Sequence, residues 1–401
     1  MISVDVARGK VIEDVMPVGA ETVSLAQALG RVLAEDVAAR VSHPPVTVSA
    51  MDGWAVRAQD VAAVPVTLAV IGQSAAGHPF AGSLAAGEAV RIFTGAPMPA
   101  GADAVVMQED SRAEGGHVTL TASSPTGKYV RAAGLDFSDG DVLLPAGTLL
   151  GARGIGLAAA MNHPWLAVRR RPRVAVLSTG DEIAMPGEPL GTAHIVGSNG
   201  PALCAFVTAL GAEPVHLGIA RDSRQSLTAM VAAAAGCDLL VISGGASVGD
   251  YDLVKDVLAE AGLVQEFYKI AMRPGKPLMF GRLHGTPVLG LPGNPVSAMV
   301  CAMLFLAPLL RSMLGLAVDL DTATAVLGRD LPANDARQDY LRAGLTRRPD
   351  TGGLVATPFP TQDSAVLSGL TAADCLVVRP PHAAAAIAGE SVTVIPLPAL
   401  W

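Results

Sequence analysis

Apolar and polar positions follow three different patterns along the chain. In residues 173–314, short apolar runs alternate with segments in which apolar residues recur at helical spacing. Strands joined through helices predict a largely parallel sheet with right-handed crossovers. The expected strands are 174–177, 214–218, 238–242, 264–270 and 287–291, and the expected helices lie near 201–210, 223–234, 251–261 and 296–313.

The flanking segments carry other patterns. Ser24 and Gln27 form a capping-box pattern followed by apolar residues at helical spacing, which predicts a helix to about residue 39, and a second helical pattern spans 152–161. Short β-type runs separated by Gly and Pro fill the region between these helices and recur after residue 319. The predicted domains are a discontinuous N-terminal domain (1–45 and 137–171), a β-rich insertion (46–136), an α/β domain (172–317) and a C-terminal β-domain (318–401).

Composition narrows the class of protein. With 51% hydrophobic residues the chain has ample material for packed cores. Its longest uncharged stretch, 285–310, contains several prolines and too few apolar residues for the roughly 20 that a bilayer requires, and no secretory signal opens the chain. A net charge of −8, without a basic stripe, argues against a nucleic-acid partner. We expect a cytoplasmic enzyme that contacts neither membrane nor nucleic acid.

Four polar clusters follow predicted strands of the central region. Because the carboxyl ends of parallel strands meet at one edge of a sheet, we expect these clusters to share one site. They are Ser-Thr-Gly-Asp-Glu at 178–182, Arg-Asp at 221–222, Ser-Gly-Gly-Ala-Ser-Val-Gly-Asp-Tyr-Asp at 243–252 and Leu-Pro-Gly-Asn-Pro at 291–295.

The third cluster has the composition of a phosphate-binding loop. Glycines between a strand and a helix let backbone N–H groups approach a phosphate, although a plain turn would have the same composition. The carboxylates of Glu182, Asp222 and Asp252 suit Mg²⁺ beside that phosphate, or act separately as helix caps. Both interpretations of each feature stay open on this pattern alone.

The same loop also matches the nucleophile elbow of serine hydrolases. Gly245, Ser247 and Gly249 have the required spacing after a predicted strand. However, the later histidines His284 and His382 fall in a predicted hairpin and a Pro-rich stretch. A serine hydrolase is therefore a secondary hypothesis.

A cationic turn, 269–277, supplies positive charge in an otherwise acidic chain. Its sequence is Lys-Ile-Ala-Met-Arg-Pro-Gly-Lys-Pro, and the prolines would hold Arg273 and Lys276 in place. The functional interpretation is that this turn binds an anionic ligand. The alternative is a solvated turn without a ligand.

Seven motifs, in order, resemble those of the MoeA-type molybdopterin molybdenumtransferases, the family that includes the E domain of gephyrin. The resemblance extends over essentially the whole chain. The motifs are Ser-Ala-Met-Asp-Gly-Trp-Ala (49–55), Phe-Thr-Gly-Ala-Pro (93–97), Gly-Ala-Asp-Ala-Val-Val-Met-Gln-Glu (101–109), Ser-Thr-Gly-Asp-Glu (178–182), the glycine loop (243–252), the Pro-Gly-Lys-Pro turn (274–277) and Leu-Pro-Gly-Asn-Pro-Val-Ser (291–297).

The resemblance implies an activity and a set of site residues. Molybdate would be inserted into adenylylated molybdopterin in a Mg²⁺-dependent step that releases AMP. The implied functional acidic and polar positions are Asp52, Thr94, Glu182, Asp222 and Asp252, of which Glu182, Asp222 and Asp252 would hold the metal. The implied substrate-binding positions are Ser243, Gly244, Gly245, Ser247, Gly249, Lys269, Pro292, Gly293, Asn294 and Pro295, with Arg273, Lys276, Ser297, Arg342 and Ser364 at the molybdate.

The resemblance also implies a fold and partners. The fold would be a multi-domain α/β protein with a three-layer central domain, a mostly parallel sheet and a small C-terminal β-barrel-like domain. A homodimer would combine the central and C-terminal domains of one chain with the β-rich insertion of the other. A molybdopterin adenylyltransferase and downstream molybdoenzyme-maturation proteins would be its partners.

Two positions depart from the family pattern, and two rival functions remain. Arg273 stands where lysine is commoner, and Asp363 stands beside Ser364 where glycine is usual. A molybdopterin adenylyltransferase would need neither the insertion nor the C-terminal domain. A non-catalytic scaffold would not need the acidic residues or the cationic turn.

Overall fold

The chain forms two compact units in this computed structural model, which describes residues 1–245, 253–349 and 352–398. The larger unit comprises Met1–Glu21 and Arg169–Trp401, and the smaller comprises Thr22–Val168. The first helix, α1 (Val4–Ile12), buries Val4, Ala7 and Val11 in the main core of the larger unit. The first 21 residues therefore pack with the larger unit.

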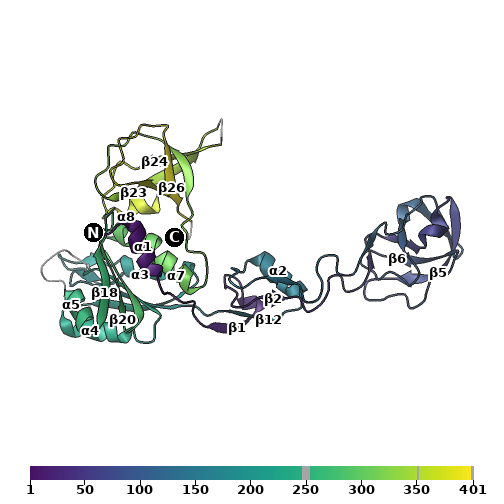
Figure 1. The fold of residues 1–401 in the computed structure, drawn as a ribbon, viewed down its shortest axis with the longest axis horizontal. Helices are drawn as coiled ribbons and strands as arrows, with labels where there is room; N and C mark the ends of the chain where they lie inside the picture. Colours follow the sequence, from purple (N-terminus) through teal and green to yellow (C-terminus); the bar gives the residue numbers. More distant parts are fainter. Residues whose placement is uncertain (246–252, 350–351, 399–401) are drawn as a thin grey trace. The chain divides into compact units, whose positions relative to one another are not determined.

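A six-stranded sheet forms the centre of the larger unit (Figure 1). Four neighbouring strands are parallel, and β20 lies antiparallel between β21 and β18, so the prediction of a mostly parallel sheet is confirmed. The strand order is β16 (Glu213–Ala220), β13 (Arg173–Thr179), β17 (Leu239–Ser243), β21 (Thr286–Leu291), β20 (Pro277–Leu283) and β18 (Leu263–Lys269).

Helices cover both faces of this sheet. Along β13, Val174 and Val176 belong to one core, whereas Ala175 and Leu177 belong to the other. Because successive side chains of a strand point to opposite faces, a strand buried on both sides requires such an uninterrupted apolar run. One face is covered by α1, α3 (Asn199–Ala209) and the long helix 295–313, and the other by α4 (Arg224–Ala233) and α5 (Leu253–Glu260).

The long helix, Pro295–Met313, is sufficiently long and apolar to cross a membrane, yet 89% of it is buried inside the protein, as for a core helix. It consists of α6 (Pro295–Cys301), a π-helical segment (Ala302–Leu306) and α7 (Ala307–Met313). The helix predicted over 296–313 is therefore confirmed, and the prolines before it separate it from β21, so the uncharged stretch 285–310 is not one continuous span. Pro308 lies in the first turn of α7, two residues after the π-helical segment, where the usual backbone ladder is already altered.

A closed β-barrel forms the C-terminal part of the larger unit (Figure 1). The additional pairing of β23 with β25 closes the ring. The barrel strands are β23 (Gln338–Arg347), β24 (Leu354–Pro358), β22 (Ala323–Leu327), β26 (Ser391–Pro396) and β25 (Cys375–Arg379). A two-residue strand from the cationic turn, β19 (Met272–Arg273), runs parallel to β23, so the turn is attached to the barrel.

The smaller unit contains the predicted β-rich region. Its sheet is buried on both faces against two apolar clusters. The strand order is β7 (Ala104–Met107), β4 (Gly53–Val56), β6 (Glu88–Ile92), β5 (Val66–Ser74), β9 (His117–Leu120) and β8 (Ser111–Glu114).

Two helices were predicted in the smaller unit, and only one of them forms. Helix α2 (Ala152–Ala160) forms as expected, but the helix predicted over 24–39 is wrong. The chain there forms β1 (Ala20–Ser24), a short 3₁₀ turn and β2 (Val37–Ala38). The Ser24 side chain makes no capping bond, and Leu33 pairs with Val168 across a β-bridge, so tertiary pairing overrides the local helical pattern.

We predict that Gly275→Ala destabilises the larger unit more than Gly285→Ala does. Both glycines have positive φ (+111° and +90°), but an added Cβ at Gly275 would lie 2.5 Å from Cys301 Sγ, whereas nothing lies within 4 Å at Gly285. Overpacking should cost about 1–3 kcal/mol beyond the shared backbone strain. Urea unfolding followed by circular dichroism measures the difference, and equal losses in the two variants would contradict the packing argument.

Candidate active site

The carboxyl ends of three parallel strands meet at one edge of the central sheet. Asn199 Nδ2 donates hydrogen bonds to Ser243 Oγ (2.7 Å) and to the Gly293 carbonyl (2.8 Å). The Gly244 amide donates to the Leu291 carbonyl (3.3 Å). These contacts join the glycine loop to the Pro-Gly-Asn-Pro segment, so the expected convergence of these two clusters is observed. Asn199, at the start of α3, was not predicted from the sequence.

The start of the glycine loop allows no side chain. Gly244 and Gly245 have φ of +96° and +66°, and an added Cβ would lie 2.6 Å from the Thr179 carbonyl oxygen or 2.3 Å from Val254 Cγ2, respectively. The Thr179 hydroxyl is buried and has no hydrogen-bond partner within the described part of the chain. The backbone is thus held close to β13. The predicted site residues Ser247, Gly249 and Asp252 lie outside the described residues.

Acidic side chains gather beside this edge. The Asp222 amide donates to Asp181 Oδ1 (3.2 Å). Burial raises the pKa of Asp222, and the negative charges of Asp181 and Glu182 raise it further, although a hydrogen bond from the Asp181 backbone amide to the Asp222 carboxylate acts in the opposite direction. Three or more potential metal ligands do not converge among residues 1–245, 253–349 and 352–398. Glu182 and Asp222 are therefore near neighbours with an excess of negative charge, a combination that a divalent cation would neutralise.

The cationic turn contains two different kinds of charge. Arg273 forms ion pairs with Asp339, its partner in the β19–β23 register, and with Asp335 (3.5 Å). Hydrogen bonds from Arg337 lower the pKa of Asp335 to about 2, so this carboxylate is ionised at neutral pH. Lys276 is exposed and has no ion-pair partner in the described chain. Lys276 is consequently the more available cation.

Lys269 stands at the end of β18, with its Nζ over the Tyr268 ring at 5.5 Å from the centroid. This contact directs the ammonium group along the aromatic face. Together with Arg273 and Lys276, Lys269 gives the segment 269–277 three positive charges.

The N-terminus of the long helix meets a loop of the barrel. Asn294 Nδ2 donates to Ser364 Oγ (2.8 Å), and the Val296 amide donates to the Ser364 carbonyl (3.2 Å). Pro295 occupies the first turn and Ser297 is buried in it. Four residues predicted from different parts of the sequence, Asn294, Pro295, Ser297 and Ser364, are therefore brought together. Arg342 lies buried on β23 and binds the same barrel loop.

Asp52 and Thr94 form a tight pair in the smaller unit. The Thr94 amide (2.7 Å) and hydroxyl (2.8 Å) both donate to Asp52 Oδ1. These two bonds, together with the nearby charge of Arg91, lower the pKa of Asp52 against a small effect of desolvation. Arg91, which the sequence did not single out, donates to the Gly53 carbonyl (3.1 Å) and stacks over Trp54 and Phe93 at 5.3 and 5.0 Å.

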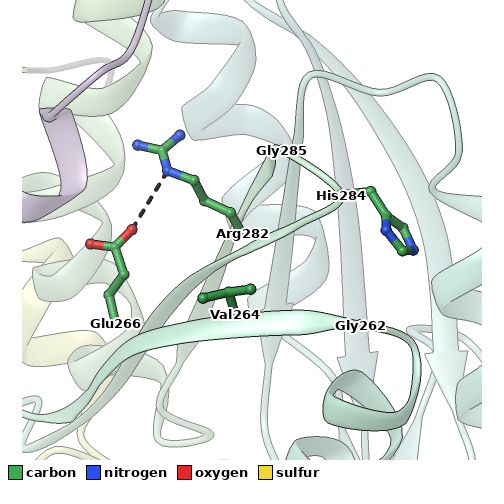
Figure 2. A pocket seen from close by; sticks show the side chains of 6 residues that line it. All are labelled: Gly262, Val264, Glu266, Arg282, His284 and Gly285. Carbon is green, nitrogen blue, oxygen red and sulfur yellow. Dashed lines mark ion pairs between the residues drawn. The ribbon is translucent and has the colours of Figure 1, made fainter.

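A cavity of about 410 Å³ lies elsewhere on the central sheet (Figure 2). Its lining includes Gly262 and Gly285, which adjoin the start of β18 and the turn between β20 and β21. This is the end of the sheet opposite to the carboxyl ends of the parallel strands. Arg282 is paired with Glu266 (3.5 Å) and donates to the Glu13 carbonyl (2.5 Å), so its charge is occupied. The cavity is separate from the predicted site residues.

Comparison with known proteins identifies the family. Residues 2–162 match the MoeA N-terminal region (domain I and II), residues 175–312 the probable molybdopterin binding domain, and residues 324–397 the MoeA C-terminal region (domain IV). A molybdopterin molybdenumtransferase of Haemophilus influenzae is 35% identical over 401 residues, covering 99% of this chain and 98% of that protein. The chain belongs to the molybdopterin molybdenumtransferase family.

Two further relatives agree with this family assignment. The molybdopterin molybdenumtransferase of Nostoc sp. (strain PCC 7120) is 38% identical over 394 residues, covering 94% of this chain and 89% of the relative. The crystal structure of a molybdopterin biosynthesis MoeA protein from Pyrococcus horikoshii matches with a TM-score of 0.87 at 34% identity, covering 99% of each chain. The predicted family and the predicted multi-domain fold, including the barrel, are confirmed.

We predict that Thr94→Val raises the pKa of Asp52 towards its ordinary value, because the hydroxyl bond is lost while the amide bond remains. A depressed carboxyl pKa stabilises the fold above the unfolded pKa, and this stabilisation disappears as the pH falls through the folded pKa. The variant should therefore be less stable than the wild type at neutral pH. Its stability should also fall less than that of the wild type when the pH is lowered. Carboxyl titration by NMR tests this, with Thr94→Ser as the control that keeps the hydroxyl; identical Asp52 titrations in wild type and Val variant would refute it.

Proposed function

We infer that this chain is a molybdopterin molybdenumtransferase of molybdenum cofactor biosynthesis, and we propose that it inserts molybdate into adenylylated molybdopterin with release of AMP. The observation that carries the proposal is the full-length relationship, which includes the insertion and the barrel together with the central domain. A molybdopterin adenylyltransferase would require only the central domain, so these additional parts favour the later step.

The sheet edge suits the nucleotide half of the substrate. Gly244 and Gly245 let the backbone approach a phosphate, and the Thr179 hydroxyl, which has no hydrogen-bond partner among the described residues, offers a further polar group. Glu182 and Asp222, with Asp252, would hold Mg²⁺ there. The raised pKa of Asp222 supports this role, because a cation would neutralise the surplus negative charge as well as that of the phosphates. Such a cation favours departure of AMP by stabilising the charge on the leaving phosphate.

The barrel side suits the molybdate. A tetrahedral dianion calls for cations and hydroxyl donors, which Lys276, Ser297 and Ser364 supply. Arg273 is largely engaged by Asp335 and Asp339, so we assign it to holding the cationic turn on β23. Molybdate is a substrate here, and these residues would hold it for transfer to the dithiolene of the pterin.

We also propose a homodimer in which Asp52 and Thr94 of one chain complete the site of the other. Exposed large apolar side chains of the smaller unit support a self-association surface: Leu29 (64%), Leu149 (57%) and Trp165 (58%). Leu29 and Leu149 lie on adjacent segments, because the Gly30 amide donates to the Leu150 carbonyl (2.9 Å).

The setting follows from the chemistry of the reaction. A molybdopterin adenylyltransferase would supply the substrate, and downstream molybdoenzyme-maturation proteins would receive the cofactor. We propose that the chain works in the cytoplasm, where both the nucleotide and reduced thiols persist. Its four cysteines are free thiols, which suits a reducing compartment.

The central experiment measures AMP release by the purified chain given adenylylated molybdopterin, Mg²⁺ and molybdate. We expect release that depends on molybdate and on Mg²⁺. Asp252→Ala should reduce the rate by about 100-fold or more if its carboxylate holds the metal. Ser247→Ala should retain substantial turnover, because a loop serine, unlike a nucleophile, can be replaced. If Asp252→Ala leaves the rate of AMP release unchanged, its carboxylate does not hold the metal. If Ser247→Ala abolishes AMP release, the serine hydrolase alternative is favoured.

Intersubunit complementation tests the shared site. Asp52→Ala and Asp252→Ala should each be inactive as homodimers. A mixed dimer of the two would contain one site with both substitutions and one with neither, so mixing them after dissociation should restore up to about half the activity per mixed dimer. Mixing two preparations of Asp52→Ala is the control. Failure to regain activity in verified mixed dimers would place all the site residues in one chain.

A further inference from the structure

Two lysines share the aromatic ring of Tyr268, near the carboxyl end of β18. Lys255 Nζ lies 5.3 Å from the ring centroid, and Lys269 Nζ lies 5.5 Å from it. An aromatic face attracts an ammonium group through its quadrupole, and the attraction is stronger where water is partly excluded. The Tyr268 ring is half-buried, so it holds both ammonium groups at one place on the larger unit.

This place adjoins the start of the glycine loop. Gly244, Gly245, Lys255 and Tyr268 all line one small cavity. Strand β18 runs parallel to β21, since both pair antiparallel with β20. Lys269 therefore lies at the same edge of the sheet as the polar clusters that follow the parallel strands. Two positive charges stand beside the backbone that was predicted to approach a phosphate.

Helix α5 directs its acidic and basic side chains to different neighbours. Its two acidic residues, Asp256 and Glu260, both form ion pairs with Arg224 of α4. Lys255 is offset from Asp256 by about 100° around the helix, because an α-helix has 3.6 residues per turn. The acids are thus turned towards α4, whereas the lysine is turned towards β18 and the glycine loop.

The arrangement suits a ligand with two adjacent phosphates. Two like charges that share one ring repel each other, and an anion bound between them removes this repulsion. Lys255 lies in the first turn of α5, where the helix N–H groups also attract an anion. A phosphoanhydride carries its negative charge on two neighbouring phosphates. It can therefore engage two ammonium groups, each as a point charge, where a single phosphate would engage them less fully.

We propose that Lys255 and Lys269 together bind the phosphoanhydride that joins the adenylyl group to molybdopterin, and that Tyr268 is the positioning residue that holds both lysines there. The inference rests on the proposed function, because that function supplies the ligand. Lys269 was predicted from the sequence, whereas Lys255 and Tyr268 were not. The nucleotide half of the site thereby extends from the backbone of the glycine loop to side chains of α5 and β18.

Nucleotide binding to the full-length protein tests the proposal without turnover. Isothermal titration calorimetry with adenosine, AMP and ADP, each with Mg²⁺, compares ligands that carry no, one and two phosphates. We expect the wild type to bind ADP more tightly than AMP, and AMP more tightly than adenosine. Lys255→Gln should weaken ADP binding about tenfold, because a charge-assisted contact is lost, and should leave adenosine binding unchanged.

Two substitutions of Tyr268 separate its ring from its hydroxyl. Tyr268→Phe keeps the aromatic face and should bind ADP within about twofold of the wild type, whereas Tyr268→Leu removes the face and should weaken ADP binding about threefold or more. The double variant Tyr268→Leu/Lys255→Gln should lose less than the two separate losses combined, because both changes act through one ammonium group. Lys10→Gln removes the same charge from the last turn of α1 and is the control that should match the wild type.

Steady-state kinetics assigns the effect to one substrate. In the AMP-release assay, Lys255→Gln and Tyr268→Leu should raise the KM for adenylylated molybdopterin and leave the KM for molybdate unchanged, because the lysines adjoin the glycine loop. A loss of general packing would instead weaken the binding of both substrates. If circular dichroism shows that Tyr268→Leu does not fold, Lys255→Gln and Lys269→Gln carry the test.

Several results would overturn the proposal. They are an unchanged affinity of Lys255→Gln for ADP, an equal loss of adenosine and ADP affinity in that variant, a Tyr268→Phe variant as defective as Tyr268→Leu, or a wild type that binds ADP no more tightly than adenosine. If the wild type binds ADP as expected but releases no AMP with molybdate, the proposed function fails, whereas the phosphate site on the two lysines stands.

Discussion

The approach of the glycine loop to β13 is the constraint on which the rest of the candidate site depends. Gly244 and Gly245 lie so close to Thr179 and Val254 that a single added carbon would collide with either neighbour. The strands that bring them together are buried on both faces and cannot shift without disturbing two cores. The polar residues at the strand ends are consequently placed by rigid elements, and only their side chains remain to be adapted to a ligand.

Strand β23 gives the second half of the site a comparable frame. Its Asp339 holds Arg273 and thereby the cationic turn, and its Arg342 holds the loop of Ser364. Arg273 thus serves the protein's own carboxylates, while Lys276 and Ser364 stay available to an anion. This division suits a site for a small dianion, because charges fixed by buried partners set the geometry while exposed donors make the contact.

The smaller unit contributes chemistry of a different kind. Two bonds from Thr94 lower the pKa of Asp52, and desolvation opposes them without cancelling their effect. Asp222 experiences the reverse situation, because burial and neighbouring carboxylates favour its protonated form. Asp52 therefore tends to carry a negative charge, whereas Asp222 is a group that a cation would ionise. Such differences arise from surroundings, since the two residues have the same side chain.

The sequence alone determined the parallel sheet, its helices and the family, because uninterrupted apolar runs such as 174–177 and the glycines after strands are local signals. It failed where distant partners decide. The helix expected over 24–39 does not form, because Leu33 pairs with Val168 across a β-bridge. Only tertiary structure could reveal Asn199 as the bridge between two clusters, or Arg342 as the support of a turn. Hydrogen bonds between residues far apart in the chain leave no periodic trace in the sequence, so their partners become visible only in the fold.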